Sequence, residues 1–387
     1  MSKPRIYLHI GEPKCGTTFL QDVMFSHRDA LAQQGVTLPG ADIQDHYRAA
    51  QDILGAEQAA DDPGGVWAGS WDALAKDART ARGTSVISHE LFCGASDEQA
   101  ARAIESLAPI DVQVVITTRD VTGLLPAEWQ ETVKHRNGRT WEQWLGDIID
   151  TPPRRRRPRA RWFWSAHSTI QIARRWSALV GAENVHVITM PPSSAPPDLL
   201  WRRFAGVLGI ESVELDLSEV RANTSLGAVE VEMLRRLNLR LEEMPMWFYA
   251  RHVKTGLAHN LLSERPKTSR VAIPAERQEW VRHESARRIE RLGELGVHIV
   301  GDLNELAAPA VFPSGASPSS VDDAVLLDAA LDTLGTILTR RYEQAAERSR
   351  VDRLARGAAP GVLRRMPFKF GRSALWRFQH AVATRRR

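Results

Sequence analysis

The sequence predicts an α/β protein with three layers, in which helices cover both faces of a central parallel sheet, followed by a C-terminal helical extension. Two patterns indicate this class. Short apolar runs typical of strands alternate along the chain with amphipathic segments typical of helices. Residues 112–117 are almost continuously apolar and β-branched, as expected for a strand that is buried on both faces of a parallel sheet.

The N-terminal half is expected to begin with a strand at about 5–10 and a helix at about 16–34, whose apolar residues recur at helical spacing. Gly35 ends this helix as a left-handed cap residue would, and Pro39-Gly40 stops a short strand at 36–38. By the same criteria, further helices are expected at about 46–54 and 67–82, and further strands at 85–88 and 112–117.

The C-terminal half is expected to continue with helices near 124–135 and 141–149 and then a proline-punctuated basic loop. Six arginines lie in this loop: Arg154, Arg155, Arg156, Arg157, Arg159 and Arg161. Periodicity and apolar runs place the later helices at 169–180, 199–208, 224–241, 277–295 and 322–347, and the later strands at 185–189 and 297–300.

The composition is that of an ordinary globular protein, because 43% of the 387 residues are hydrophobic and 25% are charged. No apolar run approaches the ~20 residues that a membrane helix needs, and the first residues lack the apolar core of a signal peptide. Cys15 and Cys93 have neither disulfide-framework nor zinc-site spacing, which favours a reducing cytoplasm. No carboxylate cluster with ligand spacing is evident, so no metal is expected.

The loop after the first strand is the most informative motif. Gly11 and Gly16 bound it, and a helix opens directly afterwards on Thr17 and Thr18. The backbone amides of such a loop converge on an anion, and the helix dipole favours negative charge there. A nucleotide triphosphatase would have a lysine immediately after the second glycine. Because the only lysine of this loop is Lys14, we expect a P-loop-like site for a nucleotide with a different tail.

The stretch Pro13-Lys14-Cys15-Gly16-Thr17-Thr18 resembles the P-K-[ST]-G-T-T loop of sulfotransferases that use 3'-phosphoadenosine 5'-phosphosulfate (PAPS), with Cys15 in place of the small hydroxyl residue. The resemblance extends over roughly residues 4–304. It implies that this loop holds the 5'-phosphosulfate, that Lys14 neutralises the leaving phosphate, and that Thr17 and Thr18 bind the same group. The alternative is an ordinary strand–turn–helix corner with an exposed lysine.

The family places a second cationic site, for the 3'-phosphate of the donor, at the end of an interior strand. Arg119 follows the strand at 112–117, and ligands of open α/β sheets bind outside the carboxyl ends of strands. An arginine there makes a bidentate phosphate contact, whereas the alternative is a surface pair with Asp120. The family's serine is missing, because Ala127 stands eight residues past Arg119. The candidates to replace this serine are Gln130, Lys134 and Arg221.

Sulfuryl transfer needs a base that takes the proton of the acceptor. The strand at 85–88 ends before His89 and Glu90, and the sulfotransferases resemble one another in placing a His or Glu near this point. His89 starts with a pKa near neutrality, whereas Glu90 needs its pKa raised by burial. Related bacterial sequences resemble S-x-E here, which favours Glu90 slightly over His89. The alternative is that Glu90 caps the next helix or pairs with an arginine and that His89 packs.

A later segment, Arg221-Ala222-Asn223-Thr224-Ser225-Leu226, resembles the N-x-S element that precedes a helix in many sulfotransferases. The resemblance implies that Arg221 and Ser225 help to bind the donor, and a simple helix N-cap is an equal alternative. His167 and the basic loop lie where the family varies its acceptor pocket. Two interpretations of the loop stay open: an acidic or sulfated acceptor, and a solvated surface.

The resemblance implies a PAPS-dependent sulfotransferase that transfers a sulfuryl group in line to a hydroxyl or amine, with a carbohydrate or lipid-linked glycan favoured as the acceptor. One rival is a P-loop kinase or nucleotide triphosphatase, for whose magnesium Asp120 is a poor match. Another rival is a non-catalytic membrane-surface protein, because aromatic and basic residues alternate over 368–378. No nucleic-acid partner is expected, since no reading motif is present.

By this interpretation, residues 1–304 form the sulfotransferase domain, with helical portions on the substrate side at about 124–180 and 224–295. Residues 305–320 are expected to form a linker, and 321–387 a helical extension with a basic tail. From Arg350 onward there are eleven Lys or Arg residues and one acid, whereas acids outnumber bases in the rest of the chain. Such a tail suits an anionic surface, so a cytoplasmic protein with peripheral attachment to the inner membrane face is expected.

Overall fold

The computed structural model describes residues 4–55, 67–210, 225–266 and 269–357, and the side chains as far as residue 350. In this described part of the chain, six strands form one sheet in the order β2-β3-β1-β4-β5-β6, and every pair is parallel. The strands are β1 (Arg5–His9), β2 (Val36–Thr37), β3 (Thr84–Ser88), β4 (Asp111–Thr118), β5 (Val185–Thr189) and β6 (His298–Val300). The three-layer α/β/α class predicted from the sequence is confirmed.

The alternation of side chains along the central strands creates the two helical layers. Ile6 and Leu8 of β1 belong to an apolar core on one face of the sheet, whereas Tyr7 belongs to the core on the other face. The first core is completed by α3 (Ile43–Ile53), α4 (Ser70–Thr80), α5 (Asp97–Leu107) and α9 (Thr169–Val180). The second core is completed by α1 (Thr17–Ser26), α2 (Arg28–Gln33) and α10 (Leu199–Leu208).

Two features of the first layers differ from the expectation. The single helix predicted at 16–34 is two helices, because the backbone leaves the helical region at His27, with φ −114° and ψ 25°. Helix α5 was not predicted at all. Its signal is a capping box, in which Ser96 and Gln99 each bond the backbone amide of the other. This pattern precedes a run of alanines and leucine that periodicity alone did not mark as a helix.

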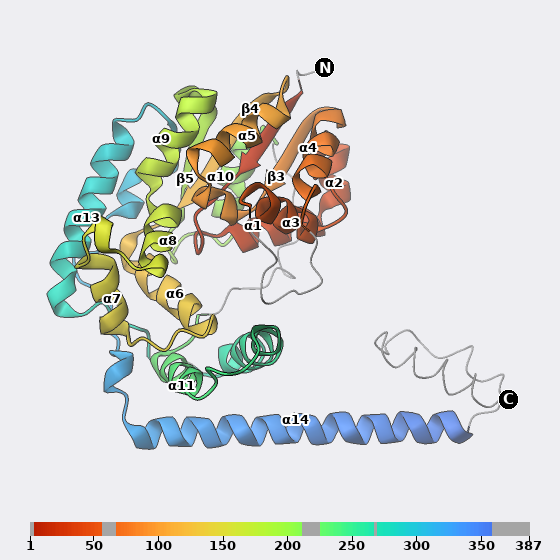
Figure 1. Cartoon of the computed structure of the whole chain (residues 1–387), viewed down its shortest axis with the longest axis vertical. Helices are drawn as coiled ribbons and strands as arrows, with labels where there is room; N and C mark the ends of the chain where they lie inside the picture. Colours follow the sequence, from red (N-terminus) through yellow and green to blue (C-terminus); the bar gives the residue numbers. More distant parts are fainter. Residues whose placement is uncertain (1–3, 56–66, 211–224, 267–268, 358–387) are drawn as a thin grey trace. The chain divides into compact units, whose positions relative to one another are not determined.

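A third apolar core lies beyond the carboxyl ends of the strands and is helical. It joins α6 (Val121–Lys134), α7 (Trp141–Ile149), α8 (Pro158–His167), α11 (Ala228–Asn238) and α13 (Ala275–Gly293). Figure 1 shows that α6, α7 and α8 follow one another at that end of the sheet. Trp129, Trp141 and Trp144 pack in sequence there, with ring centroids 5.4 and 5.7 Å apart. Their aromatic area stabilises a helical subdomain that lies beside the loop after β1.

Two helical stretches of this subdomain were not anticipated. Helix α8 begins at Pro158, inside the segment that was expected to be a basic loop, since proline is favourable at the first position of a helix. Helix α12 (Met246–Tyr249) continues into the π-helix η4 (Ala250–His259). Short 3₁₀ helices η1 (Glu90–Gly94), η2 (Pro153–Arg155), η3 (Ala182–Asn184), η5 (Leu262–Glu264), η6 (Leu303–Leu306) and η7 (Pro318–Ser320) fill the connections.

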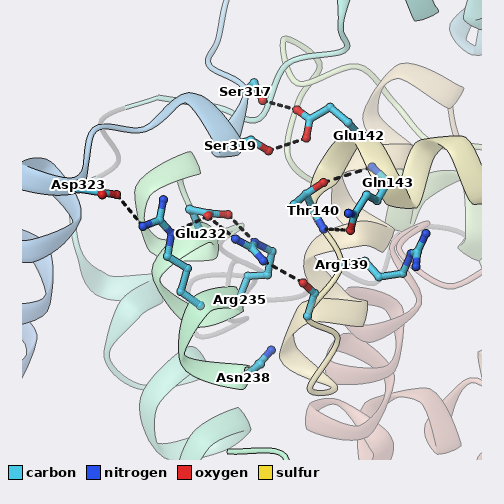
Figure 2. Close-up of polar contacts among 12 residues, drawn as sticks. Arg139, Thr140, Glu142, Gln143, Glu232, Arg235, Asn238, Ser317, Ser319 and Asp323 are labelled. Carbon is cyan, nitrogen blue, oxygen red and sulfur yellow. Dashed lines mark hydrogen bonds and ion pairs between the residues drawn. The ribbon is translucent and has the colours of Figure 1, made fainter. Parts of the chain in front are cut away.

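The predicted linker at 305–320 contains part of η6 and all of η7, and it is attached to α7. The hydroxyl of Ser319 donates to the Glu142 carboxylate at 2.5 Å, and Ser317 donates to the other oxygen (Figure 2). Contacts divide the chain into two units, Met1–Leu326 and Leu327–Arg387, and the long helix α14 (Asp323–Gly357) spans the division. Residues 358–387, with the predicted tail, lie outside the described residues. In the described helices, no stretch is both long and apolar enough to cross a bilayer.

A buried ion cluster stabilises α11 against the loop that precedes α7. Glu232, which is 1% exposed, accepts two bonds from Arg235 at 2.6 and 2.7 Å and one from Arg236 at 2.9 Å. Arg235 also donates to the carbonyl of Gly138, and Figure 2 shows Glu232 and Arg235 pointing toward one another. Removal of the carboxylate would leave the buried guanidinium of Arg235 without its counter-ion.

We therefore expect Glu232→Ala to lower the free energy of unfolding by about 3 kcal/mol, as for other buried ion pairs that lose one partner. The matched control is Glu294→Ala, which removes a carboxylate from the exposed pair with Arg291 and is expected to change it by less than about 0.5 kcal/mol. Urea denaturation measures both values. Equal losses in the two variants would contradict a structural role for the buried cluster.

Candidate functional site

The loop that follows β1 remains hydrogen-bonded to β4 over residues 10–12 and then turns into α1. The amides of Ile10 and Glu12 donate to Val115 and Thr117 of β4 at 2.9 and 3.0 Å, and the amide of Cys15 closes the turn onto the Glu12 carbonyl. Lys14 and Gly16 have φ values of 64° and 85°, in the left-handed region. Gly16 is the N-cap of α1. The strand therefore passes into the helix within one tight turn.

The start of α1 presents hydrogen-bond donors that the chain does not use. Within the described residues, no hydrogen bond is found for the amide N–H groups of Lys14, Gly16, Thr17 and Thr18. The Thr17 side chain is 3% exposed, and its hydroxyl has no partner among the described residues. Helix α1 has no acidic residue in its first turn and no side-chain cap. Free amides and a buried hydroxyl at the positive end of a helix dipole favour an anion.

Gly11 is required by the close packing under this loop. A Cβ atom at Gly11 would lie 2.6 Å from the Thr17 hydroxyl and 2.7 Å from the Thr117 hydroxyl. Any larger residue would therefore move the Thr17 side chain away from its position at the start of α1. The sequence analysis singled out both glycines by their spacing. In the structure, a side chain at Gly11 would clash with neighbouring hydroxyls, and Gly16 has a positive φ.

Lys14 is directed to α6 and does not extend into solvent. Its Nζ lies 2.7 Å from Oε2 of Glu131, which also contacts Lys134 at 3.6 Å. Burial by itself would raise the pKa of Glu131, but the hydrogen bond from His135 and the charges of Lys14 and Lys134 hold this pKa well below its usual range. Glu131 is therefore an ionised partner that fixes the ammonium beside the loop.

Arg119 lies between the loop and the start of α6. Its Nη1 donates to the carbonyl of Lys14 at 3.3 Å, and its Nε is buried without a hydrogen-bond partner among the described residues. The nearest carboxylate, on Asp120, lies 3.7 Å from Nε and is engaged at 2.7 Å by the amide of Gly123 as the N-cap of α6. A Cβ at Gly123 would meet the guanidinium, so this glycine makes room for it. Arg119 thus keeps donor capacity next to the loop.

His89 and Glu90 follow β3, and the amide of His89 donates to the carbonyl of His9 at the end of β1. The Nδ1 of His89 accepts the amide proton of Leu91 at 3.2 Å and caps η1. Burial lowers the pKa of His89, against the opposing charge of Glu90. With Nδ1 engaged, the neutral ring carries its proton on Nε2. The side chain of Glu90 is 29% exposed, and its Oε2 is buried without a hydrogen bond among the described residues, 4.0 Å from Nδ1 of His89. Of the two, Glu90 has the free lone pair.

Glu12 is a functional-site residue that the sequence analysis missed. It is fully buried at the turn of the loop, and its carboxylate accepts hydrogen bonds from the hydroxyls of Thr169 and Thr118, the latter at 3.3 Å. The thiol of Cys15 lies 3.9 Å from the same carboxylate. Burial, and then the charge of Glu12, raise the pKa of Cys15, so this thiol stays protonated. The signal in the sequence that could have indicated Glu12 is its position between Gly11 and Gly16 of the loop.

A second buried acid, Glu128 of α6, interacts electrostatically with Lys14 of the loop. Its Oε2 is 3.4 Å from Nε2 of His167, which is fully buried and thus not open to an acceptor in this structure. Burial would raise the pKa of Glu128, but His167 and Lys14 lower it. Arg288 of α13 donates to the His167 carbonyl at 2.7 Å, and its Nη1 has no partner among the described residues. These interactions attach α8 to α6 and α13 to α8.

The remaining predicted residues fall into two groups. Gln130 accepts the amide proton of Leu226 at 2.9 Å, so it attaches the segment before α11 to α6. Ser225 is exposed directly before that contact. Arg221, with Asn223 and Thr224, lies outside the described residues, and its donor-binding role stays a prediction. Among the described residues, no group of three His, Cys, Asp or Glu side chains is arranged to hold a metal.

Comparison with known proteins adds one similarity of fold. A crystal structure of a sulfotransferase from Alicyclobacillus acidocaldarius is similar to this chain at 15% sequence identity, with a TM-score of 0.38, over 63% of this chain and 96% of that one. No protein-family model and no curated protein sequence matches the chain. So remote a similarity carries no argument about activity, which is drawn below from the residues of the site.

The Thr17 hydroxyl gives a prediction that separates ligand binding from folding. Thr17→Val removes a buried hydroxyl that bonds nothing in the described chain, so we expect the free energy of unfolding to fall by no more than about 0.5 kcal/mol. We expect the affinity for adenosine 3',5'-bisphosphate, measured by calorimetry, to fall by about tenfold, because a charge-assisted hydrogen bond is lost.

Thr169→Val is the matched control for this substitution. It removes an equally buried hydroxyl that donates to Glu12, and it is expected to lower the free energy of unfolding by about 1–3 kcal/mol. Similar destabilisation by both variants, or unchanged bisphosphate affinity in Thr17→Val, would argue against an anion site at the start of α1.

Proposed function

We propose that the protein transfers a sulfuryl group from PAPS to a hydroxyl or amine of an acceptor, for which a carbohydrate or lipid-linked glycan is the favoured class. The observation that supports this most is the start of α1, where the amides of Gly16, Thr17 and Thr18 and the buried Thr17 hydroxyl have no partners in the described chain. These donors suit the 5'-phosphosulfate, and the loop lacks the lysine that a triphosphate would require after Gly16.

The proposed donor site extends from this loop to Arg119. The guanidinium of Arg119 keeps a buried Nε that makes no hydrogen bond in the described chain and lies next to the Lys14 carbonyl, so it suits the 3'-phosphate. Of the candidates to replace the family's serine, Gln130 accepts the amide proton of Leu226, and Arg221 lies outside the described residues. Lys134 is paired with Glu131 on α6 and is not assigned to the donor.

The proposed transfer is a single in-line displacement. A bond forms between the acceptor oxygen or nitrogen and the sulfur, and the bond from sulfur to the 5'-phosphate oxygen breaks, leaving its electron pair on the phosphate. Lys14 offsets the charge that develops on this leaving group, and Glu90 takes the acceptor proton. Glu90 follows β3 and the loop follows β1, and these strands are neighbours in register from Arg5 and Thr84 to His9 and Ser88. The base and the loop therefore share one edge of the sheet.

A kinase or nucleotide triphosphatase finds less support at this site. The strand-end acid that would hold magnesium is Asp120, and its carboxylate caps α6 through the amide of Gly123. The lysine of the loop is held by Glu131, away from the position that follows Gly16. Calorimetry with ATP–Mg and with adenosine 3',5'-bisphosphate tests the choice, and preference for ATP–Mg would overturn the proposal.

The assignment of Arg119 gives a second prediction about the donor. Arg119→Ala is expected to weaken binding of adenosine 3',5'-bisphosphate by at least about tenfold, and binding of adenosine 5'-monophosphate by less than about twofold, because only the former carries a 3'-phosphate. Arg202→Ala removes an exposed arginine of α10 and is the control. Equal losses for the two nucleotides would show that Arg119 does not contact the 3'-phosphate.

The choice between Glu90 and His89 gives a third prediction. Glu90→Gln is expected to lower the rate of transfer from ³⁵S-labelled PAPS to a panel of sugar, phenol and amine acceptors by about a hundredfold or more, with unchanged bisphosphate affinity. His89→Gln is expected to cost much less, because the Nδ1 of His89 is engaged by Leu91. The opposite ranking of the two variants would make His89 the base.

A further inference from the structure

Three lysines from three separate elements converge on one carboxylate next to the loop. Glu131 of α6 lies 2.7 Å from Lys14 of the loop, 3.6 Å from Lys134 of α6 and 3.7 Å from Lys254 of η4. His135 also contacts Glu131, at 3.2 Å, and Lys254 lies 2.6 Å from His135. We call these five residues the Glu131 cluster.

The Glu131 cluster brings more positive than negative charge to one partly buried place. Lys134 is 8% exposed, and the side chains of Lys14 and Lys254 are 30% and 26% exposed. Burial lowers the pKa of Lys134 and Glu131 opposes that effect, while Lys14 and Lys254 lower it further. Like charges so close together repel one another unless anions are near. A second anion at this place would therefore be stabilised.

The donor accounts for only part of this charge. Lys14 is proposed to serve the leaving phosphate, because it belongs to the loop. Lys254 comes from η4, an element of the helical subdomain that carries neither the loop nor Arg119. Lys254 therefore reaches the same carboxylate from an element other than the loop and α6, and it is available to a second ligand beside the donor. Cations there would offset the repulsion between a negatively charged donor and a negatively charged acceptor.

A second basic region lies beside the proposed base. Helix α8 packs against η1, which begins at Glu90, and a Cβ at Gly94 of η1 would meet the Trp162 ring at 2.8 Å. The segment that precedes and begins α8 contains five exposed arginines, and the sequence has no acid between Asp150 and Glu183. The arginines are Arg154, Arg155, Arg157, Arg159 and Arg161. Exposed positive charge therefore lies on and before the helix that packs against the element beginning at Glu90.

We propose that the acceptor is an anionic molecule, carrying carboxylate, sulfate or phosphate groups, and that Lys134 and Lys254 bind one of these groups in competition with Glu131. This inference rests on the proposed function, because it assigns Lys14 to the donor and Glu90 to the acceptor. Glu131 acts as an internal competitor that keeps the three ammonium groups close together. The arginines before α8 and in its first turns extend the same recognition along a larger acceptor.

The experiment uses the full chain saturated with adenosine 3',5'-bisphosphate and citrate as a small carboxylate probe, with binding measured by calorimetry. Lys254→Gln is expected to weaken citrate binding by about tenfold, and Glu131→Gln to strengthen it, because the internal competitor loses its charge. Lys134→Gln repeats the test at the more buried lysine. The matched control is Lys76→Gln, which removes an exposed lysine of α4 and is expected to leave citrate binding unchanged.

The outcomes separate the two proposals. Equal citrate affinity in Lys254→Gln and Lys76→Gln would overturn the anionic acceptor site. Citrate that displaces the bisphosphate, instead of binding beside it, would overturn it as well, because the lysines would then belong to the donor. Failure of the bisphosphate to bind, together with citrate binding that depends on Lys254, would refute the PAPS donor while retaining the anion site.

Discussion

The carboxylate of Glu12 is the interaction on which the candidate site depends. It is buried where the loop leaves β1, and it accepts hydroxyl protons from the end of β4 and the start of α9. These bonds attach the loop to two other elements before the chain turns into α1. A buried carboxylate is costly unless it is hydrogen-bonded, so the loop is stable only where all three elements meet. The orientation of the free amides at Gly16 and Thr17 follows from this attachment.

Charged residues of α6 are a second constraint, because they determine where the Lys14 side chain lies. This helix carries Glu128, Glu131 and Lys134 on the side that faces the loop, and each of them interacts electrostatically with Lys14. Two acids and two lysines near one loop form a coupled network, in which the position of each charge depends on the others. The loop lysine is therefore positioned by residues that are more than a hundred positions away in the sequence.

The fold was largely predictable because its signals are local. Helices α7, α9 and α10 and strand β5 have the predicted bounds, since apolar patterns cover each of them, a capping box precedes α7, and a glycine follows α9 and α10. Helix α5 was missed although its capping box and apolar spacing are helix signals, and the stretch α12–η4 is wound partly as a π-helix, whose spacing differs from that of an α-helix. The break at His27 was also missed, because residues on both sides of it continue the same apolar stripe.

Only the part of the candidate site that lies in a short sequence motif was predictable from the sequence. Spacing marked Gly11 and Gly16, and the resemblance to sulfotransferases marked Lys14, the threonines and Arg119. The partners of these residues depend on tertiary contacts, and no local pattern links Glu131 to Lys14 or Thr169 to Glu12. The sequence favoured Glu90 only slightly over His89, and the structure adds the hydrogen bond that the Leu91 amide donates to Nδ1 of His89.

The order β3-β1-β4 at the centre of the sheet makes the activity of the site depend on the register of the strands. The proposed base, the loop and Arg119 each follow one of these three adjacent strands. A slip of one residue between two strands moves their ends by roughly 3.3 Å relative to one another, whereas productive alignment of reacting groups tolerates about 1 Å. A chain that folded with a shifted strand would be compact but inert. Turnover per molecule would then report the fraction of chains whose strands are correctly aligned.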